Sequence, residues 1–134
     1  GLLQSGETVA LPDGRVIQPG DVLGPGRRGR SVVFATDTMP CHGMERLCAN
    51  ADIAFLEGMF TLNHADEAKK KKHSTAASSA EIAARAGVKQ LVLVHISPRY
   101  TFEDEKILAS EAAVHFPTVR IGRGLDTWDV PLPD

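Results

Sequence analysis

Residues 91–100, LVLVHISPRY, begin as a buried strand and end in side chains that can carry chemistry. Four aliphatic residues in a row are typical of a strand that is covered on both faces, as in a parallel sheet. His95 follows directly, and Arg99 and Tyr100 come soon after it. An imidazole in this place indicates either a hydrogen-bonded core residue or part of a site at the strand end.

Two earlier apolar stretches end in the same way. Residues 31–35 lead into Asp37, and residues 53–56 lead into Glu57. In α/β sheets, side chains that follow separate strands converge on a ligand at the carboxyl edge. Each residue alone has an ordinary explanation, such as capping a helix, but the repetition makes Asp37, Glu57 and His95 a candidate site.

Helical patterns separate these strands. Residues 42–51 have a short helical pattern, and a helix begins directly after His73 with Ser74 or Thr75 as its cap. Residues 102–116 form an amphipathic pattern with four apolar side chains near one face: Ile107, Leu108, Ala112 and Phe116. Strands that alternate with helices predict an α/β fold with a largely buried sheet.

The two ends of the chain add strands of another kind. Residues 8–11 and 15–17 flank Pro12-Asp13-Gly14, a turn sequence typical of a β-hairpin, and a glycine-rich connector follows. Residues 116–121 predict a last short strand.

The composition is that of a globular protein. With 134 residues, 43% hydrophobic and 24% charged, the chain fits one domain with a real core. It contains no apolar stretch long enough to cross a membrane, and its first residues lack the regions of a signal peptide. We therefore expect a cytoplasmic protein with no membrane partner. Because the chain begins at Gly1 without a methionine, we do not assume that the natural protein starts there.

The charge is unevenly distributed. A net charge of -2 excludes a uniformly basic nucleic-acid binder. Residues 27–30 nevertheless contain three arginines, and Lys69 to Lys72 run without interruption. Each cluster fits a solvated loop, and each also fits a local basic patch.

The residue types at the strand ends suit zinc, which accepts carboxylate and imidazole ligands. Two ligands are too few, so further ones must come from His42, His64 or His73, or from outside the chain. Cys41 and His42 with Cys48 are an alternative second site, although their spacing matches no standard zinc motif. The two cysteines form no disulfide framework and fit a reduced compartment.

His73 has a different setting from His95, since it lies in a polar loop before a helix whose first N–H groups would be free to attract an anion. This place suits phosphate chemistry. A protonated His73 could donate a proton to a leaving oxygen, with Glu57 orienting the ring. The alternative is a surface histidine beside a capped helix.

Read in order, these residues resemble the C-terminal half of the ribonuclease Z family, the tRNA 3′-processing endonucleases of the metallo-β-lactamase superfamily. The resemblance runs almost from end to end, and six segments carry it: LPDGRVI, DVLGPG, ATDTMPC, FLEGMF, KHSTAASSAEIA and VLVHISPRY. The family has a Gly-His-Ser-Thr helix start and a strand that ends in Leu-Thr-His-x-Ser-x-Arg-Tyr. Several spaced motifs in the right order are far more specific than any of them alone.

The resemblance implies a role for each candidate residue. Asp37 resembles the aspartate that bridges two zinc ions, and His95 resembles the histidine that completes the second one. The metals would activate a hydroxide and stabilise charge on the attacked phosphate, with Mn or Mg as alternatives to zinc. Glu57 and His73 resemble the pair that protonates the departing oxygen of precursor tRNA. Three residues are implied at the substrate, with Arg99 either contacting phosphate or holding its loop: Arg99, Ser74 and Thr75.

Two local departures affect the expected geometry. The family's His-Glu-Ala-Thr is Leu56-Glu57-Gly58-Met59 here, and its glycine before His73 is Lys72. These changes keep the functional side chains and alter the loops that hold them.

The larger departure is an absence, because the family's early His-x-His-x-Asp-His motif is nowhere in the chain. Residues 1–134 are therefore expected to be the C-terminal half of an αββα sandwich, a mixed β-sheet with helices on its outer face. Such a half would expose one face of its sheet. We expect it to pack against the missing N-terminal half or against another copy, to form the family's homodimer, and not to cleave RNA alone.

Two other functions remain open from the sequence. One is a related phosphodiesterase that acts on cyclic nucleotides or small phosphodiesters. The other is a non-catalytic half-domain that keeps the sheet for pairing with a partner protein.

Overall fold

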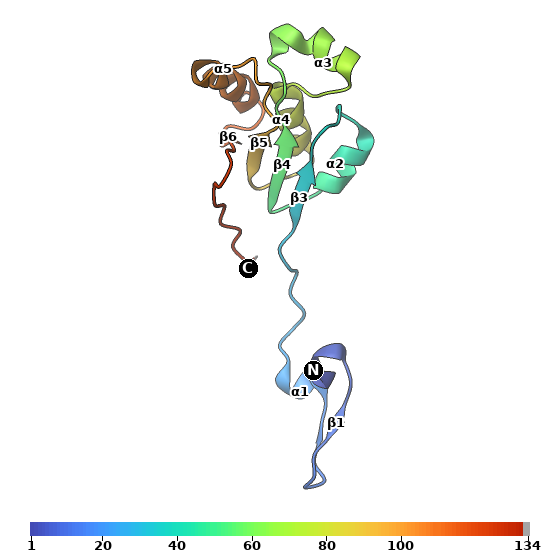
Figure 1. The fold of residues 1–134 in the computed structure, drawn as a ribbon. Helices are drawn as coiled ribbons and strands as arrows, with labels where there is room; N and C mark the ends of the chain where they lie inside the picture. Colours follow the sequence, from blue (N-terminus) through green and yellow to red (C-terminus); the bar gives the residue numbers. More distant parts are fainter. Residues whose placement is uncertain (133–134) are drawn as a thin grey trace. The chain divides into compact units, whose positions relative to one another are not determined.

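The computed structural model describes residues 1–132, which divide into two compact units, Gly1–Gly29 and Arg30–Leu132 (Figure 1). The composition predicted a single domain, and the structure has two such units. Whether both belong to one half of a larger domain stays a prediction.

The first unit is the predicted hairpin with its connector. Gly14, with φ of 84°, makes the turn, and the backbone N–H of Arg15 donates to the Asp13 carboxylate at 3.1 Å. Among residues 1–29, all of which the structure describes, no side chain is buried. This unit therefore has no core of its own. Its elements are a short 3₁₀ helix η1 (Leu2–Ser5), the antiparallel strands β1 (Val9–Ala10) and β2 (Val16–Ile17), and α1 (Pro19–Val22).

The second unit is built on a four-stranded sheet in the order β3-β4-β5-β6, parallel throughout. The register pairs Ala35 with Leu56 and Glu57 with Val94, so the strands end side by side. Among residues 1–132, the antiparallel pairing that a mixed sheet would require is found in the hairpin unit and not in this sheet. The strands of the sheet are β3 (Val32–Ala35), β4 (Ile53–Glu57), β5 (Leu91–Val94) and β6 (Arg120–Ile121).

Helices alternate with these strands, as predicted, and the α/β fold class is confirmed. None of the helices in the described part of the chain combines the length and the hydropathy that a membrane crossing requires. The helical elements of this unit are α2 (His42–Cys48), η2 (Leu62–His64), α3 (Ala65–Lys71), α4 (Ala76–Arg85) and α5 (Phe102–Ala113).

Helices α2, α4 and α5 cover one face of the sheet. Their buried side chains, among them Met44, Ala80 and Leu108, pack in one cluster with Leu56 and Leu93 of the central strands. One detail of the predicted amphipathic face is wrong. Ile107 was expected beside Leu108, but it is 48% exposed, since α5 turns only the stripe through Leu108, Ala112 and Phe116 toward the core.

The other face of the sheet is only partly covered. Phe34 of β3 is 68% exposed, while Phe55 of β4 lies under Trp128 of the C-terminal segment, with 6.2 Å between the ring centroids. Val32, the next outward-facing residue of β3, is 59% exposed. This face of the sheet is therefore partly open, and a second half that would cover it stays a prediction.

Helix α3 was not predicted, because residues 65–71 lack the apolar periodicity on which a helix prediction depends. Only Ala68 of this helix is buried. The helix is instead favoured electrostatically, with Asp66 and Glu67 in its first turn and three lysines in its last. The lysine run thus belongs to a helix end rather than to the solvated loop that the sequence suggested.

Candidate metal centre

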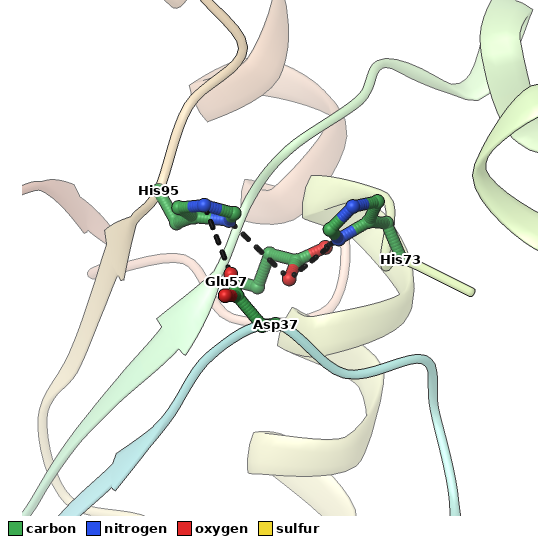
Figure 2. A group of neighbouring side chains, drawn as sticks. All are labelled: Asp37, Glu57, His73 and His95. Atoms are coloured by element: carbon green, nitrogen blue, oxygen red, sulfur yellow. Dashed lines mark hydrogen bonds and ion pairs between the residues drawn. The ribbon is translucent and has the colours of Figure 1, made fainter. Parts of the chain in front are cut away.

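Four side chains from separate segments meet at the carboxyl edge of the sheet, where Asp37, Glu57, His73 and His95 each offer an atom within 4.8 Å of the others (Figure 2). Asp37 follows β3, Glu57 ends β4 and His95 follows β5. His73 joins them from the loop before α4. Parallel strands with a common register bring these ends together, and the convergence predicted from the sequence is confirmed.

Asp37 and His95 face each other at the outer side of the group. The Nε2 atom of His95 lies 2.9 Å from Oδ1 of Asp37. Both residues leave their strands in the left-handed conformation, with φ of 56° and 54°. This conformation costs a non-glycine residue about 1 kcal/mol or more, and such strain is found where a site requires the orientation.

Glu57 lies inside the group and is fully buried. Its carboxylate accepts the N–H of Ser74 at 2.7 Å and the N–H of Thr38 at 3.2 Å. It also faces both imidazoles, since Nδ1 of His73 is 3.0 Å from Oε1 and Nδ1 of His95 is 3.4 Å from Oε2. The buried Glu57 carboxylate therefore orients both histidine rings through their Nδ1 atoms. The donor from Thr38 was missed, because a backbone N–H leaves no mark in a sequence.

The start of α4 differs from the sequence prediction, which left its first N–H groups free for an anion. The N–H of Ser74 donates to Glu57, that of Ala76 to the Phe60 carbonyl and that of Ser78 to the Thr75 hydroxyl. The N–H groups of Ala76 and Ser78 are therefore bonded within the protein, and the Glu57 carboxylate takes the N–H of Ser74 just before the helix cap.

Ser74 and Thr75 lie beside the group, with their hydroxyls engaged by the protein. Ser74 is fully buried and donates to the carbonyl of Thr38 at 2.7 Å. Thr75 is the cap of α4, as one of the two sequence alternatives had it, and accepts the N–H of Ser78 at 3.1 Å. Both residues fix the loop that carries His73.

Arg99 stays outside the group of four. Its Nη1 and Nη2 atoms donate to the two carboxylate oxygens of Glu67 in α3, at 2.8 and 2.7 Å. Hydrogen bonds from Arg99 and Lys71 lower the pKa of Glu67 to about 2, and the same pair raises the pKa of Arg99. Of the two roles considered from the sequence, this contact favours holding the loop.

The contribution of this ion pair to the stability of the protein should be sensitive to acid. The pKa of Glu67 falls from 4.5 to about 2 on folding, so its stabilising contribution is complete above pH 4.5 and is lost as the pH falls toward 2. We expect Glu67→Gln to destabilise the protein at pH 7 by a small amount, since the pair is partly exposed, and to make no difference near pH 2. Urea unfolding of both proteins at the two pH values measures this. A gap that persists at pH 2 would contradict it.

The remaining candidate ligands do not join the group. Nδ1 of His64 lies 3.1 Å from the Tyr100 hydroxyl, away from the four residues. Among residues 1–132, only Asp37, Glu57, His73 and His95 form such a cluster, so the alternative second site at Cys41, His42 and Cys48 is not formed. Cys41 is exposed, whereas burial of Cys48 raises the pKa of its thiol.

The two local departures from the family pattern can now be placed. Lys72 has φ of 61° at the end of α3, a conformation that glycine adopts without cost. Gly58 is buried, and a Cβ atom there would come within 3.0 Å of Ile96 and 3.1 Å of Leu93. The loop at Lys72 therefore has a conformation that suits glycine, while at Gly58 the family's alanine would require a small shift of Ile96 or Leu93. Glu57 reaches the group despite both changes.

The donor set fits a metal ion of the zinc type. Zinc accepts carboxylate and imidazole ligands at about 2 Å, which places two ligands of one ion roughly 3 Å apart. The Asp37 and His95 atoms are separated by 2.9 Å. Glu57 faces Nδ1 of His95 at 3.4 Å and would orient that ligand, whereas His73 contacts Glu57 itself.

A family model described as the β-lactamase superfamily domain matches residues 12–96, a stretch that contains all four residues of the group. The chain belongs to the β-lactamase superfamily. The carboxyl-edge cluster lies within the stretch that the superfamily model matches.

Curated members of the superfamily resemble the chain over nearly its whole length. Ribonuclease Z from Ligilactobacillus salivarius (strain UCC118) is 37% identical over 134 residues, which are 100% of this chain and 42% of that protein. Ribonuclease Z from Synechococcus sp. (strain CC9311) is 42% identical over 134 residues, 96% of this chain and 42% of that protein. The chain therefore spans about two fifths of the length of these relatives.

A solved structure shares the fold. The crystal structure of human tRNase Z, short form, matches with a TM-score of 0.60 and 24% identity, covering 87% of this chain and 37% of that one. At this identity the likeness concerns the arrangement of strands and helices alone.

Proposed function

We propose that this chain is the C-terminal part of a zinc-dependent endoribonuclease that removes the 3′ trailer from precursor tRNA. One observation carries the proposal: Asp37 and His95 face each other 2.9 Å apart, and a second carboxylate–imidazole pair, Glu57 and His73, lies beside them in the same group. The first pair suits a metal and the second suits proton transfer. The curated relatives named ribonuclease Z supply the substrate class.

Asp37 and His95 are the proposed metal ligands of this chain. A bound metal would supply an activated hydroxide and offset the charge of the attacked phosphate. Two ligands do not complete a zinc site, so the others would come from the N-terminal half that the family resemblance implies. Two ions are expected in the complete domain, and Mn or Mg remain alternatives to zinc.

Glu57 and His73 are the proposed proton-transfer pair. Because Nδ1 of His73 points at the buried Glu57 carboxylate, this nitrogen carries a hydrogen and Nε2 is the atom that remains for the substrate. A proton held at Nε2 would pass to the departing 3′ oxygen of the tRNA. Glu57 would stabilise the charged ring until that transfer.

The surroundings of His73 fit a polyanion. Lys69, Lys70 and Lys72 are exposed at the end of α3, next to His73 in the chain. Cations placed there would attract the RNA backbone. Ser74 and Thr75 would act on the substrate by holding His73 in place, because their hydroxyls are already bonded within the protein.

The uncovered sheet face supports a partner. Phe34 is 68% exposed on the face that lacks helices. We propose that the missing N-terminal half covers it in the complete domain, and that the complete protein forms a homodimer in the cytoplasm. The isolated chain would then be inactive, because it would lack the remaining metal ligands. One face of its sheet would also be uncovered.

The test uses the natural polypeptide that contains this chain, with any partner that copurifies. We expect stoichiometric zinc and cleavage of a precursor tRNA after the tRNA body, leaving a free 3′ hydroxyl. Residues 1–134 alone should show neither property, which serves as the matched control. Product ends mapped by sequencing and metal measured by atomic emission give the two readouts.

The other functions predict different results. Faster hydrolysis of a cyclic nucleotide or a small phosphodiester than of precursor tRNA would overturn the nuclease proposal in favour of a related phosphodiesterase. A natural protein without zinc and without hydrolysis would favour the non-catalytic half-domain.

A further inference from the structure

We infer that Glu67 and Arg99 are positioning residues for the reaction proposed above, because their ion pair, set over Phe60, holds the segment that carries His73 against the loop that carries His95. We call Glu67, Arg99 and Phe60 the α3 clamp. The inference rests on the proposed function, and it adds a role for residues outside the metal group.

The pair itself has the geometry of a fixed contact. Two parallel hydrogen bonds of 2.8 and 2.7 Å join the Arg99 fork to Glu67, and Lys71 adds a third contact to the same carboxylate at 2.8 Å. The Arg99 guanidinium also lies 5.0 Å from the Phe60 ring centroid. Bidentate pairs of this kind are specific in direction, and stacking on an aromatic ring fixes them further. The fork is thereby unavailable for a phosphate.

Phe60 transmits this contact to the start of α4. It is buried, and its ring centroid lies 6.2 Å from that of His73. Its N–H donates to the Ser74 carbonyl at 3.3 Å, and its carbonyl accepts the N–H of Ala76 at 2.9 Å. The residue under the ion pair is therefore bonded to the backbone that directly follows His73.

Helix α3 holds His73 from the other side. The N–H of His73 donates to the carbonyl of Ala68 at 2.8 Å, so the backbone of His73 is hydrogen-bonded to the last turns of the helix. Ala68 and Lys69 also line a cavity of about 250 Å³ that includes the His73 side chain. A shift of α3 would change both the position of His73 and the space beside it.

The loop after His95 is hydrogen-bonded to the segment that contains Phe60. The N–H of Ser97 donates to the carbonyl of Met59 at 3.3 Å, and the Tyr100 hydroxyl accepts the N–H of Thr61 at 3.1 Å. These bonds tie the loop to the segment on either side of Phe60. The ion pair is then the side-chain contact that joins α3 to Arg99 of this loop, beside the bond from the His73 N–H to Ala68. Without it, α3 would keep few anchors, since only Ala68 of the helix is buried.

The test compares Glu67→Gln, Arg99→Gln and the double variant in the natural polypeptide, with Arg85→Gln as control. Arg85 forms an ion pair of a similar kind on the exposed side of α4, with Glu81 and Glu45. Each protein is assayed with precursor tRNA and with bis(p-nitrophenyl) phosphate, whose leaving group departs without a proton. Hydrogen exchange of residues 65–73 is measured by mass spectrometry.

We expect kcat for precursor tRNA to fall about 10- to 100-fold in each single variant and no further in the double variant, since a misplaced proton donor has this effect. The activated diester should be hydrolysed within about twofold of the wild-type rate. Residues 65–73 should exchange faster in all three variants. Arg85→Gln should leave every measurement unchanged.

Other results would overturn the inference. If only Arg99→Gln weakens binding and lowers its salt dependence, Arg99 contacts phosphate. If both substrates lose activity equally, the pair supports the fold in general. If the wild type cleaves no precursor tRNA, the proposed function fails, and the α3 clamp is then judged by hydrogen exchange alone. Exchange of residues 65–73 that is the same in the variants and the wild type would reject the clamp. Faster exchange in the variants would retain it as a structural contact.

Discussion

Replacing His95 with alanine should remove cleavage of precursor tRNA almost completely while the protein remains folded. His95 is one of two metal ligands proposed for this chain, and its Nε2 atom lies 2.9 Å from the Asp37 carboxylate. A catalytic metal contributes several kcal/mol to the transition state, so its loss corresponds to a decrease on the order of 10³-fold in kcat. The side chain is 38% exposed, and the stability should change by about 1 kcal/mol or less.

The measurement combines steady-state cleavage, zinc content and urea unfolding of the natural polypeptide. His115→Ala is the matched control, since His115 is exposed just after α5 and takes no part in the group. Its activity and zinc content should equal those of the wild type. Full activity of His95→Ala with stoichiometric zinc would show that His95 is no ligand.

Replacing Glu57 with alanine should have the largest effect on stability. The carboxylate is fully buried and accepts the N–H groups of Ser74 and Thr38, which would lose their acceptors. An unsatisfied buried donor costs about 1 to 3 kcal/mol, so we expect a loss of about 2 to 5 kcal/mol in the free energy of unfolding. His73 would also lose its fixed orientation, and cleavage should fall at least 10²-fold.

Glu57→Gln separates these two effects. The amide keeps one acceptor oxygen, so we expect about 1 kcal/mol of destabilisation, but it removes the negative charge that His73 faces. Glu45→Ala is the control, because Glu45 is a partly exposed carboxylate of α2 and its loss should cost less than about 1 kcal/mol. Equal stability of Glu57→Ala and Glu45→Ala would refute the role assigned to the buried carboxylate.

All four residues of the metal group were proposed from the sequence, and for three of them the signal was local. Asp37, Glu57 and His95 each stand at the end of an apolar run, and parallel strands bring such ends together. His73 required more, since a loop histidine has no strand to place it. It was proposed from its place in a polar loop directly before a helix, the resemblance to a family implied the same pair, and the structure places it within reach of Glu57.

The parts that sequence reasoning missed depend on contacts between distant, polar residues. Glu67 and Arg99 are 32 positions apart, and nothing in either segment indicates the other. Helix α3 has no apolar stripe, so periodicity could not find it. The free helix start was predicted from a general property of helices, and it was wrong because the N–H of Ala76 donates to the Phe60 carbonyl and that of Ser78 to the Thr75 hydroxyl.

The parallel sheet has a consequence for the order in which the site forms. Each of β3, β4 and β5 is separated from the next by a helical crossover, so Asp37, Glu57 and His95 meet only after every crossover has closed. Pairing of this kind is slow, and a chain with one strand undocked would hold at most part of the group. A metal ion would therefore bind preferentially to the fully folded chain, and its binding would stabilise the completed sheet against unfolding.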